Sequence, residues 1–406
     1  MTKCDEFSRG WPTLLAAMFG SAVGISGLLA YNLGLFVKDL TGAIGLSRTH
    51  FGTSVLLATF GMAMMMPIVG WLVDRLSGRT AAAGSAVLLS LTFVAMGTMM
   101  HSVPVFLALV ALLGVLGSAT TPVSFTRAVT TWFEEARGLA LALIMTGIGV
   151  SSVSVPRITA AVIETWGWQS GFLLLAAISA LSIPVTLWLL RSRDEQGSKA
   201  PARVTNARFT AIRRRGLFWL QATAFATMAL TFFGMMVHLV PMLRDQGLTS
   251  RAAAGYVSLL GGSIICSRVL VGWLADMVHA PWLAMASCAS GGLACAAMAS
   301  GYPSCLPFVS IAVGVAVGAE TDLLGYLTAR YFGLQVYGRV YAWQYGLFIV
   351  AAGSSPAWVG FVRDRTGSYS AGLLISAGLS LVAMFIFFLL PPYRETRSQQ
   401  AEPEPT

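Results

Sequence analysis

The sequence predicts an all-α membrane protein with twelve transmembrane helices in two pseudo-symmetric six-helix bundles. Three observations support this fold class. Hydrophobic residues make up 56% of the 406-residue chain and charged residues 11%, against roughly 45–50% and 25% in soluble domains. Apolar runs long enough to cross a hydrocarbon layer of about 30 Å recur along the chain. A motif from the first half returns in the second half.

Twelve apolar segments approach or exceed the roughly 20 residues that a membrane-spanning helix requires. The first of them is too long for the core of a cleaved signal peptide, so we expect it to be retained. The predicted spans are residues 12–37, 50–73, 81–100, 104–131, 138–163, 168–190, 217–243, 252–276, 281–300, 304–331, 339–362 and 370–390. The predicted domains are a first bundle (1–190), a linker (191–216), a second bundle (217–390) and a disordered tail (391–406).

The distribution of basic residues predicts the orientation in the membrane. Eight of the 26 Lys and Arg lie between Arg191 and Arg215, within the linker. If both termini are cytoplasmic, 17 Lys and Arg lie in cytoplasmic segments, six lie outside and three lie within spans. Because basic residues concentrate on the cytoplasmic side, this arrangement predicts a multi-pass protein of a bacterial inner membrane with both termini in the cytoplasm. The net charge of +9 therefore indicates topology and does not predict a nucleic-acid partner.

A short internal repeat relates the two halves. Gly70-Trp71-Leu72-Val73-Asp74 returns 202 residues later as Gly272-Trp273-Leu274-Ala275-Asp276. Each copy follows the second predicted span of its half. Duplicated halves with a binding site between them are a recurring plan of secondary transporters. The repeat therefore favours a transporter over other classes of membrane protein.

Three segments resemble known transporter signatures. The segment GWLVDRLSGRT, Gly70 to Thr80, resembles the cytoplasmic signature between helices two and three of the major facilitator superfamily. The segment from Trp132 to Gly149 resembles the signature between helices four and five of monocarboxylate porters. Ser267 to Asp276 is similar to the eighth helix of that branch and of oxalate–formate exchangers. The resemblance implies the major facilitator fold and a small organic anion as substrate.

The sequence also departs from these families. Ile264 stands one turn before Arg268, where the animal lactate carriers have an aspartate. No lysine lies between Gly338 and Val362, the region that carries the helix-eleven lysine of the oxalate exchanger. The Gly-Pro signature of drug antiporters is also missing from the fifth span. Neither the substrate nor its coupling ion can therefore be transferred from these families.

The repeated motif predicts a gate at the cytoplasmic ends of the helices. Its glycines allow neighbouring helices to approach closely. Its aspartates favour a nearby cation or the positive end of a helix dipole. The arginines of the first copy can pair across the gate or bind lipid phosphate, and a plain basic loop is the alternative. The predicted gating residues are Gly70, Asp74, Arg75, Arg79, Gly272 and Asp276.

Two arginines within predicted spans are candidates for binding an anion. Arg268 lies near mid-depth, where an ionisable group costs about 2.5–3.5 kcal/mol on insertion scales and should face a cavity or a partner. Since a guanidinium can bind a carboxylate through two parallel hydrogen bonds, we predict that Arg268 binds the substrate. A structural ion pair is the alternative. Arg127 lies nearer the cytoplasmic end, where substrate contact, gating and snorkelling are all open.

Two acids in the tenth predicted span, Glu320 and Asp322, are candidates for proton coupling. They point about 200° apart on a helix, so we expect one to line the cavity and the other to be held in helix packing. Asp322 is favoured as the proton site, and a permanent salt bridge is the alternative. Further substrate contacts are predicted at Tyr31, Asn32, Gln344, Tyr345 and His238, although a lone histidine is more often a hydrogen-bonding residue.

The sequence thus predicts a monomeric, proton-coupled importer of a mono- or dicarboxylate or an aromatic acid, with no cofactor or metal. An exporter of amphipathic compounds by proton antiport is the alternative, and a membrane sensor is a remote one because the longest inner loop has 26 residues. No phosphate-binding loop for ATP is present. We expect no enzymatic activity, because the histidines form no catalytic or metal-binding pattern; they are His50, His101, His238 and His279.

Overall fold

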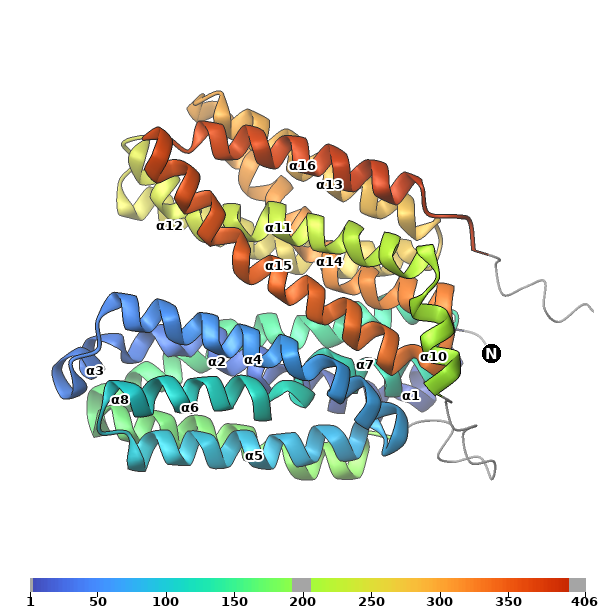
Figure 1. The fold of residues 1–406 in the computed structure, drawn as a ribbon, viewed down its shortest axis with the longest axis horizontal. Helices are drawn as coiled ribbons and strands as arrows, with labels where there is room; N and C mark the ends of the chain where they lie inside the picture. The colour runs from blue at the N-terminus through green and yellow to red at the C-terminus, as the bar shows by residue number, and fades with distance from the viewer. Residues whose placement is uncertain (1–2, 192–205, 394–406) are drawn as a thin grey trace, which may run out of the picture.

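The computed structural model describes residues 3–191 and 206–393, and the regular elements in these ranges are all helices. The first group is α1 (Lys3–Ala22), α2 (Ile25–Asn32), η1 (Leu33–Phe36), α3 (Val37–Ile44), α4 (Arg48–Arg75), α5 (Gly78–Met99), α6 (Val103–Leu116), η2 (Ser118–Thr120), α7 (Pro122–Trp132) and α8 (Arg137–Leu189). The second is α10 (Asn206–Arg213), α11 (Gly216–Asp245), α12 (Ser250–Ala275), α13 (Ala280–Ala299), η3 (Pro303–Cys305), α14 (Leu306–Phe332), η4 (Leu334–Val336), α15 (Tyr337–Thr366) and α16 (Ser370–Phe388) (Figure 1).

Many of these helices are long and apolar enough to cross a membrane. Within the described ranges nine pass this test, and ten if α6 and α7, bent by 52°, form one broken span. α8 has 53 residues, and the non-helical Gly167 (φ 83°, ψ 168°) separates its two parts, which match the fifth and sixth predicted spans. The chain is therefore a multi-pass membrane protein. The count of twelve spans stays a prediction.

The first predicted span, residues 12–37, is not one continuous helix but is interrupted between α1 and α2. α1 already begins at Lys3, and the chain breaks between α1 and α2. At the break the Ile25 N–H donates a hydrogen bond of 2.9 Å to Thr120 Oγ1, in η2, where the fourth predicted span also bends. Backbone groups at membrane depth need partners within the protein. A side chain at the break in the fourth predicted span therefore supplies the partner for a backbone N–H at the break in the first.

The helices form two groups that match the two halves of the sequence (Figure 1). In the first, α8 packs against α1 and α5; in the second, α12 packs against α14, and α11 against α15. α4 packs on α15 and α8 on α12 across the two groups. The exact bundle boundaries stay a prediction. Linker residues 192–205 and tail residues 394–406 lie outside the described residues, and the end of the predicted linker contains α10.

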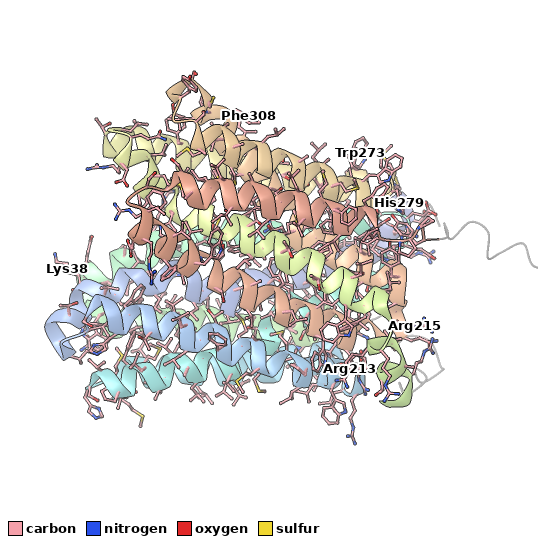
Figure 2. The ribbon with its side chains drawn as sticks, turned by 45° about the horizontal axis from the view of Figure 1, so that its top comes forward. Lys38, Arg213, Arg215, Trp273, His279 and Phe308 are labelled. Atoms are coloured by element: carbon pink, nitrogen blue, oxygen red, sulfur yellow. The ribbon has the colours of Figure 1, made fainter. Side chains whose placement is uncertain are left out.

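The two ends of the molecule differ in how closely the halves approach. Figure 2 shows Lys38 at one end, here called the outer end, and Arg215 and His279 at the other, the inner end. Near the inner end a Cβ atom at Gly70 would lie 2.8 Å from the Gly338 carbonyl oxygen of the other half. Towards the outer end the ribbons of the two groups diverge (Figure 1). The halves are therefore in close contact at the inner end and further apart at the outer end.

Candidate functional site

Arg268 and Asp322 form an ion pair between α12 and α14. Arg268 Nη1 lies 3.0 Å from Asp322 Oδ1 and donates a second 3.0 Å hydrogen bond to Thr321 Oγ1. The Asp322 side chain is only 2% exposed and that of Arg268 is 15% exposed. Asp322 Oδ2 is buried and has no hydrogen-bond partner among the described residues. The pair is thus nearly enclosed, yet it leaves polar atoms without partners.

Residues of both halves surround this pair. The Tyr345 hydroxyl of α15 lies beside Ser26 of α2 and close enough to interact electrostatically with Arg268 and Tyr31. Tyr345 is buried, whereas Tyr31 of α2 is 48% exposed. Arg268 therefore lies where the second half faces the first. This is the arrangement that a site between two duplicated halves requires.

Aromatic rings line α15 beside the pair. The rings of Tyr337, Tyr341, Tyr345 and Phe348 follow one another at four- and three-residue spacing, with centroids 5.3, 5.6 and 5.8 Å apart. This spacing places them on one face of the helix. Tyr341 is fully buried near Asp322 and Arg268, and its hydroxyl has no partner among the described residues. The site thus combines one cation and one acid with a wall of tyrosines.

Glu320 is the second acid of α14. Its side chain is fully buried, and neither carboxyl oxygen has a hydrogen-bond partner among the described residues. It lies near Cys288 of α13 and interacts electrostatically with Arg268. The two acids thus occupy different surroundings: Asp322 contacts the arginine directly, whereas Glu320 lies inside the second half. Which of the two acids lines a substrate cavity stays a prediction.

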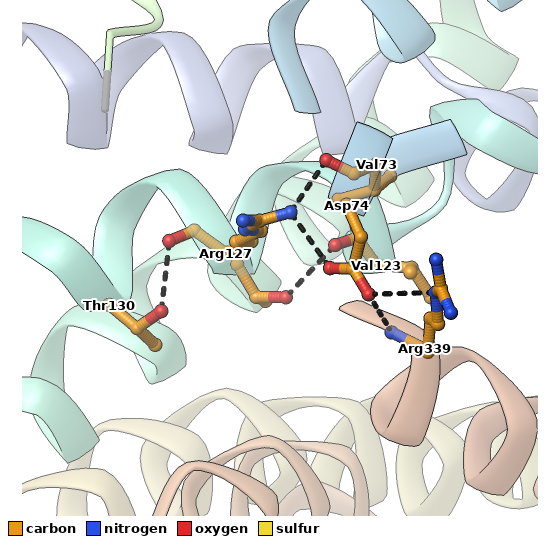
Figure 3. Close-up of polar contacts among 7 residues, drawn as sticks. Val73, Asp74, Val123, Arg127, Thr130 and Arg339 are labelled. Atoms are coloured by element: carbon orange, nitrogen blue, oxygen red, sulfur yellow. Dashed lines mark hydrogen bonds and ion pairs between the residues drawn. The ribbon is translucent and has the colours of Figure 1, made fainter. Parts of the chain in front are cut away.

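Asp74 joins the two halves at the inner end (Figure 3). Its Oδ1 lies 2.8 Å from Arg127 Nη1, and its Oδ2 accepts a 3.2 Å hydrogen bond from the Arg339 N–H and lies 3.5 Å from Arg339 Nε. Arg127 also donates a 2.6 Å hydrogen bond to the Val73 carbonyl oxygen. Arg339 belongs to the first turn of α15, so Asp74 contacts both a cation and a helix N-terminus.

Asp276 makes the equivalent contact with different partners. Its Oδ1 accepts a 2.7 Å hydrogen bond from the Gly138 N–H and its Oδ2 a 3.2 Å bond from the Leu139 N–H, both in the first turn of α8. Burial raises the pKa of the Asp276 carboxyl to about 6, although these bonds and the nearby Lys3 and Arg330 act to lower it. The aspartate of each copy of the motif therefore accepts hydrogen bonds from the first turn of a helix in the other half.

Glycines allow the helices to meet at these contacts. A Cβ atom at Gly272 would lie 2.5 Å from Ala142 Cβ and 2.6 Å from the Gly138 carbonyl oxygen. A Cβ at Gly70 would lie 2.7 Å from Ala342 Cβ. Real Cβ atoms do not approach so closely, so larger residues at these positions would force the halves apart. The small residues thus permit closure of the inner end.

Comparison with known proteins identifies the family. A family model described as Major Facilitator Superfamily matches residues 14–345. This range covers most of the chain. The chain belongs to the Major Facilitator Superfamily. It is therefore a member of a family of membrane transporters, as the signature at Gly70 to Thr80 predicted.

Individual relatives support the monocarboxylate-porter resemblance within the superfamily. Mouse monocarboxylate transporter 11 is 28% identical over 94% of this chain and 88% of the relative. Bovine monocarboxylate transporter 13 is 25% identical over 95% of this chain and 90% of the relative. The solved fucose:proton symporter FucP of E. coli shares the fold, with a TM-score of 0.73 at 15% identity over 94% of this chain and 98% of that chain.

Several predicted contact residues of this superfamily member serve local packing. Gln344 Oε1 accepts 3.0 Å hydrogen bonds from Gln221 and Thr328 in the interior of the second half. His238 lies 2.9 Å from the Pro356 carbonyl oxygen and 3.2 Å from the Tyr369 hydroxyl. Asn32 donates to a carbonyl oxygen of its own helix over 2.8 Å. Within the described residues, none of these three side chains forms a hydrogen bond with Arg268.

The arginines predicted beside Arg268 or at the gate take different positions. Arg127 lies at the inner end against Asp74, and not at the Arg268 pair. Arg75 lies over the Trp71 ring, 4.8 Å from its centroid. Arg79 forms no ion pair with a residue in the described ranges. Among the predicted substrate contacts, the structure thus gathers Arg268, Tyr31 and Tyr345, and places Arg127 at the gate.

Sequence reasoning missed a buried anchor at the start of the chain. Glu6 is 3% exposed, and its Oε1 accepts two 3.0 Å hydrogen bonds from the Glu134 and Glu135 N–H groups. Its Oε2 accepts a third, of 3.1 Å, from the Ala136 N–H. The carboxylate thus holds the loop that leads into α8. The only sequence signal is an acid in the polar segment before an apolar run, and that pattern does not specify a distant partner.

Proposed function

We propose that this transporter imports a small organic anion together with a proton, by alternating access. The observation that carries the proposal is the unused edge of the Arg268 guanidinium. Nη1 makes the hydrogen bonds to Thr321 and Asp322, whereas Nε and Nη2 make none with a described residue. A guanidinium edge can bind a carboxylate through two parallel hydrogen bonds. Arg268 would therefore bind the substrate carboxylate while still touching Asp322.

The names of the relatives support an anionic substrate. Both curated relatives described above are monocarboxylate transporters. The Tyr345 and Tyr31 side chains beside Arg268 suit an apolar or aromatic body with a polar end. A monocarboxylate, dicarboxylate or aromatic acid would satisfy both features. The proposed class of substrate rests on one cation and the tyrosines beside it.

Proton coupling would follow from the contact between Arg268 and Asp322. A substrate carboxylate on the free edge of Arg268 would place a second negative charge beside the Asp322 carboxylate, on the same guanidinium. Protonation of Asp322 would therefore strengthen substrate binding, and substrate binding would strengthen proton binding by the same factor. A loaded site would then carry both an anion and a proton, and an empty site would keep the ion pair. This reciprocity is what a symporter needs.

The contacts between the halves support alternating access. Asp74 and Asp276 would hold the inner end closed, while the separation at the outer end would admit substrate. FucP, a structural relative, was solved in the outward conformation. Opening would require both aspartates to leave the helix N-termini that they contact. We assign Arg127 to this gate and not to the substrate.

Orientation and location are part of the proposal. The basic residues favour placing the inner end, with both termini, in the cytoplasm. The two relatives quoted above come from animals, so a bacterial inner membrane rests on the sequence expectation alone. The proposed transporting unit is a monomer, because the site is built from the two halves of one chain.

Uptake into proteoliposomes tests this function. Purified protein would be given labelled mono-, di- and aromatic carboxylates, with the outside either more acidic than the lumen or at equal pH. We expect at least one acid to accumulate above its external concentration only with the pH gradient. If no acid enters, or if entry requires a sodium gradient instead, the proposed substrate or coupling is wrong.

A further inference from the structure

A basic cavity at the inner end lies apart from both the substrate site and the gate. It lies between α1 and the end of α8 and has a volume of about 280 Å³. Its lining includes Arg9, Thr13, Trp132, Trp188 and Arg191. We propose that this cavity binds the headgroup of an anionic phospholipid. This site does not depend on the proposed substrate.

The backbone that carries the two arginines is held in place before any ligand arrives. The Arg191 carbonyl oxygen accepts hydrogen bonds of 3.1 Å from the Thr13 hydroxyl and 2.6 Å from the Trp132 indole N–H. These bonds fix the chain where it leaves α8. Arg9 belongs to α1, which is fixed to the loop before α8 by the three hydrogen bonds to Glu6. Preorganisation of this kind lowers the entropy lost on binding.

The chemistry of the cavity fits a phosphodiester. A guanidinium is planar, permanently charged and able to bind phosphate oxygens through two hydrogen bonds. Neither Arg9 nor Arg191 forms an ion pair within residues 3–191 or 206–393. Basic pockets on the cytoplasmic side of membrane proteins bind anionic lipid headgroups. The pair is therefore suited to one headgroup phosphate.

The surroundings of the cavity favour a lipid over a free phosphate ion. Trp188, at the end of α8, is 71% exposed, and Trp11 of α1 is 52% exposed. Exposed tryptophans concentrate at the level of the lipid headgroups. One or two turns deeper in the same helices, Leu15 is 49% and Leu181 59% exposed, which continues the apolar surface below the cavity. Acyl chains would therefore have apolar surface beneath a basic headgroup site.

Native mass spectrometry of the full-length protein in detergent tests the site. Phosphatidylglycerol and phosphatidylcholine with identical chains would be titrated against wild type and the double variant Arg9→Gln/Arg191→Gln. We expect wild type to bind one phosphatidylglycerol at least tenfold more tightly than phosphatidylcholine, and the double variant to lose this preference. The matched control is Lys38→Gln/Arg365→Gln, which removes two exposed charges at the outer end and should keep it.

Two further arms make the outcome decisive. Arg9→Lys/Arg191→Lys keeps both charges and should recover most of the preference, which a misfolded protein would not do. Millimolar inorganic phosphate should fail to displace phosphatidylglycerol. Equal phosphatidylglycerol affinity in wild type and the Gln double variant would overturn the proposal. Displacement by inorganic phosphate would also overturn it, because the site would then recognise a free anion.

Discussion

Arg268 on α12 donates a 3.0 Å hydrogen bond to Asp322 on α14, 54 residues further along the chain. The contact satisfies one guanidinium nitrogen and one carboxylate oxygen, and it leaves Asp322 Oδ2 buried without a partner among the described residues. A buried ion pair is strongly stabilising only when its remaining polar atoms are also satisfied. This pair is therefore better suited to exchanging partners during transport than to fixing the fold.

Replacing Asp322 should separate coupling from substrate binding. Asp322→Asn keeps the shape of the side chain but removes the proton site beside Arg268. We expect uphill uptake driven by a pH gradient to be lost, so that the accumulation ratio falls to about one, while exchange of internal for external substrate is largely retained. Both rates would be measured in the same proteoliposomes with labelled substrate.

Glu320→Gln provides the matched control on the same helix. Glu320 is buried away from direct contact with Arg268, so we expect this variant to keep uphill uptake. If Asp322→Asn still concentrates substrate and Glu320→Gln does not, the proton site is Glu320. If both variants concentrate substrate, neither acid of α14 couples the proton.

Enlarging Gly272 should prevent closure of the inner end. A Cβ at this position would lie 2.5 Å from Ala142 Cβ, so Gly272→Val must push α12 away from α8. We expect Leu139→Cys, at the contact with Asp276, to react several times faster with a thiol reagent from the inner side. The measurement requires a background without the five native cysteines.

Gly262→Val is the control for this experiment. It makes the same change on the same helix, where a Cβ would meet no atom within 4 Å. Its effect on the reactivity of the introduced cysteine should be small. Equal reactivity in both variants would contradict the assignment of Gly272 to closure of the inner end.

Acidification at the inner end should favour the closed contact of Asp276. In the closed state burial raises the pKa of this carboxyl to about 6, and on opening it would return to water and its ordinary value of about 3.9. The closed state therefore binds the proton more tightly, and it gains stability as the pH falls through this window. Asp276 alone should raise the closed-to-open ratio about tenfold between about pH 7 and pH 5.

The distance between spin labels on α8 and α12 at the inner end would report this equilibrium. Asp276→Asn should reduce the pH dependence by about the factor assigned to this carboxyl, and Asp74, which makes the equivalent contact in the other copy of the motif, remains as a second source. His279→Gln should preserve it: burial lowers the pKa of His279, but its ring contacts Trp282 and Tyr393 of its own half and should be little affected by opening. A pH dependence that is unchanged in Asp276→Asn would rule out this carboxyl as a source.

The proposed orientation predicts which cysteines can be labelled from outside. Lys38 is exposed at the outer end and Arg215 at the inner end (Figure 2). In intact cells, Lys38→Cys should react with a membrane-impermeant maleimide and Arg215→Cys should not. After permeabilisation both should react. Labelling of Arg215→Cys alone in intact cells would invert the topology.

The positions of most spans follow from the sequence because hydrocarbon thickness sets their length. Predicted spans 50–73 and 281–300 correspond to α4 (Arg48–Arg75) and α13 (Ala280–Ala299). The break between α1 and α2 was missed, because the partner of Ile25 is a hydroxyl 95 residues away. The pattern of apolar residues indicates which segments lie in lipid. It does not indicate which distant side chain will bond the backbone N–H that a break in a helix leaves free.

The charged residues of the candidate site could be predicted from the sequence, but their neighbours could not. An arginine and two acids within spans must face partners, and this requirement singled out Arg268, Asp322 and Glu320 before their geometry was known. The requirement does not specify which polar residues lie together. Gln344 was predicted at the site, but it is bonded to Gln221 and Thr328 inside the second half. Such choices depend on helix rotation and packing, which the pattern of apolar residues leaves open.

The central claim is that Arg268 recognises a carboxylate, and uptake of an acid compared with its amide tests it most directly. Once a transported acid is identified, the labelled acid and its neutral amide would be compared in wild type, Arg268→Lys and Arg268→Ala proteoliposomes. We predict that wild type takes up the acid and excludes the amide. Arg268→Lys should bind the acid at least tenfold more weakly, because the two-point contact is lost. Arg268→Ala should be inactive. Uptake of the acid by Arg268→Ala with unchanged affinity would contradict the claim.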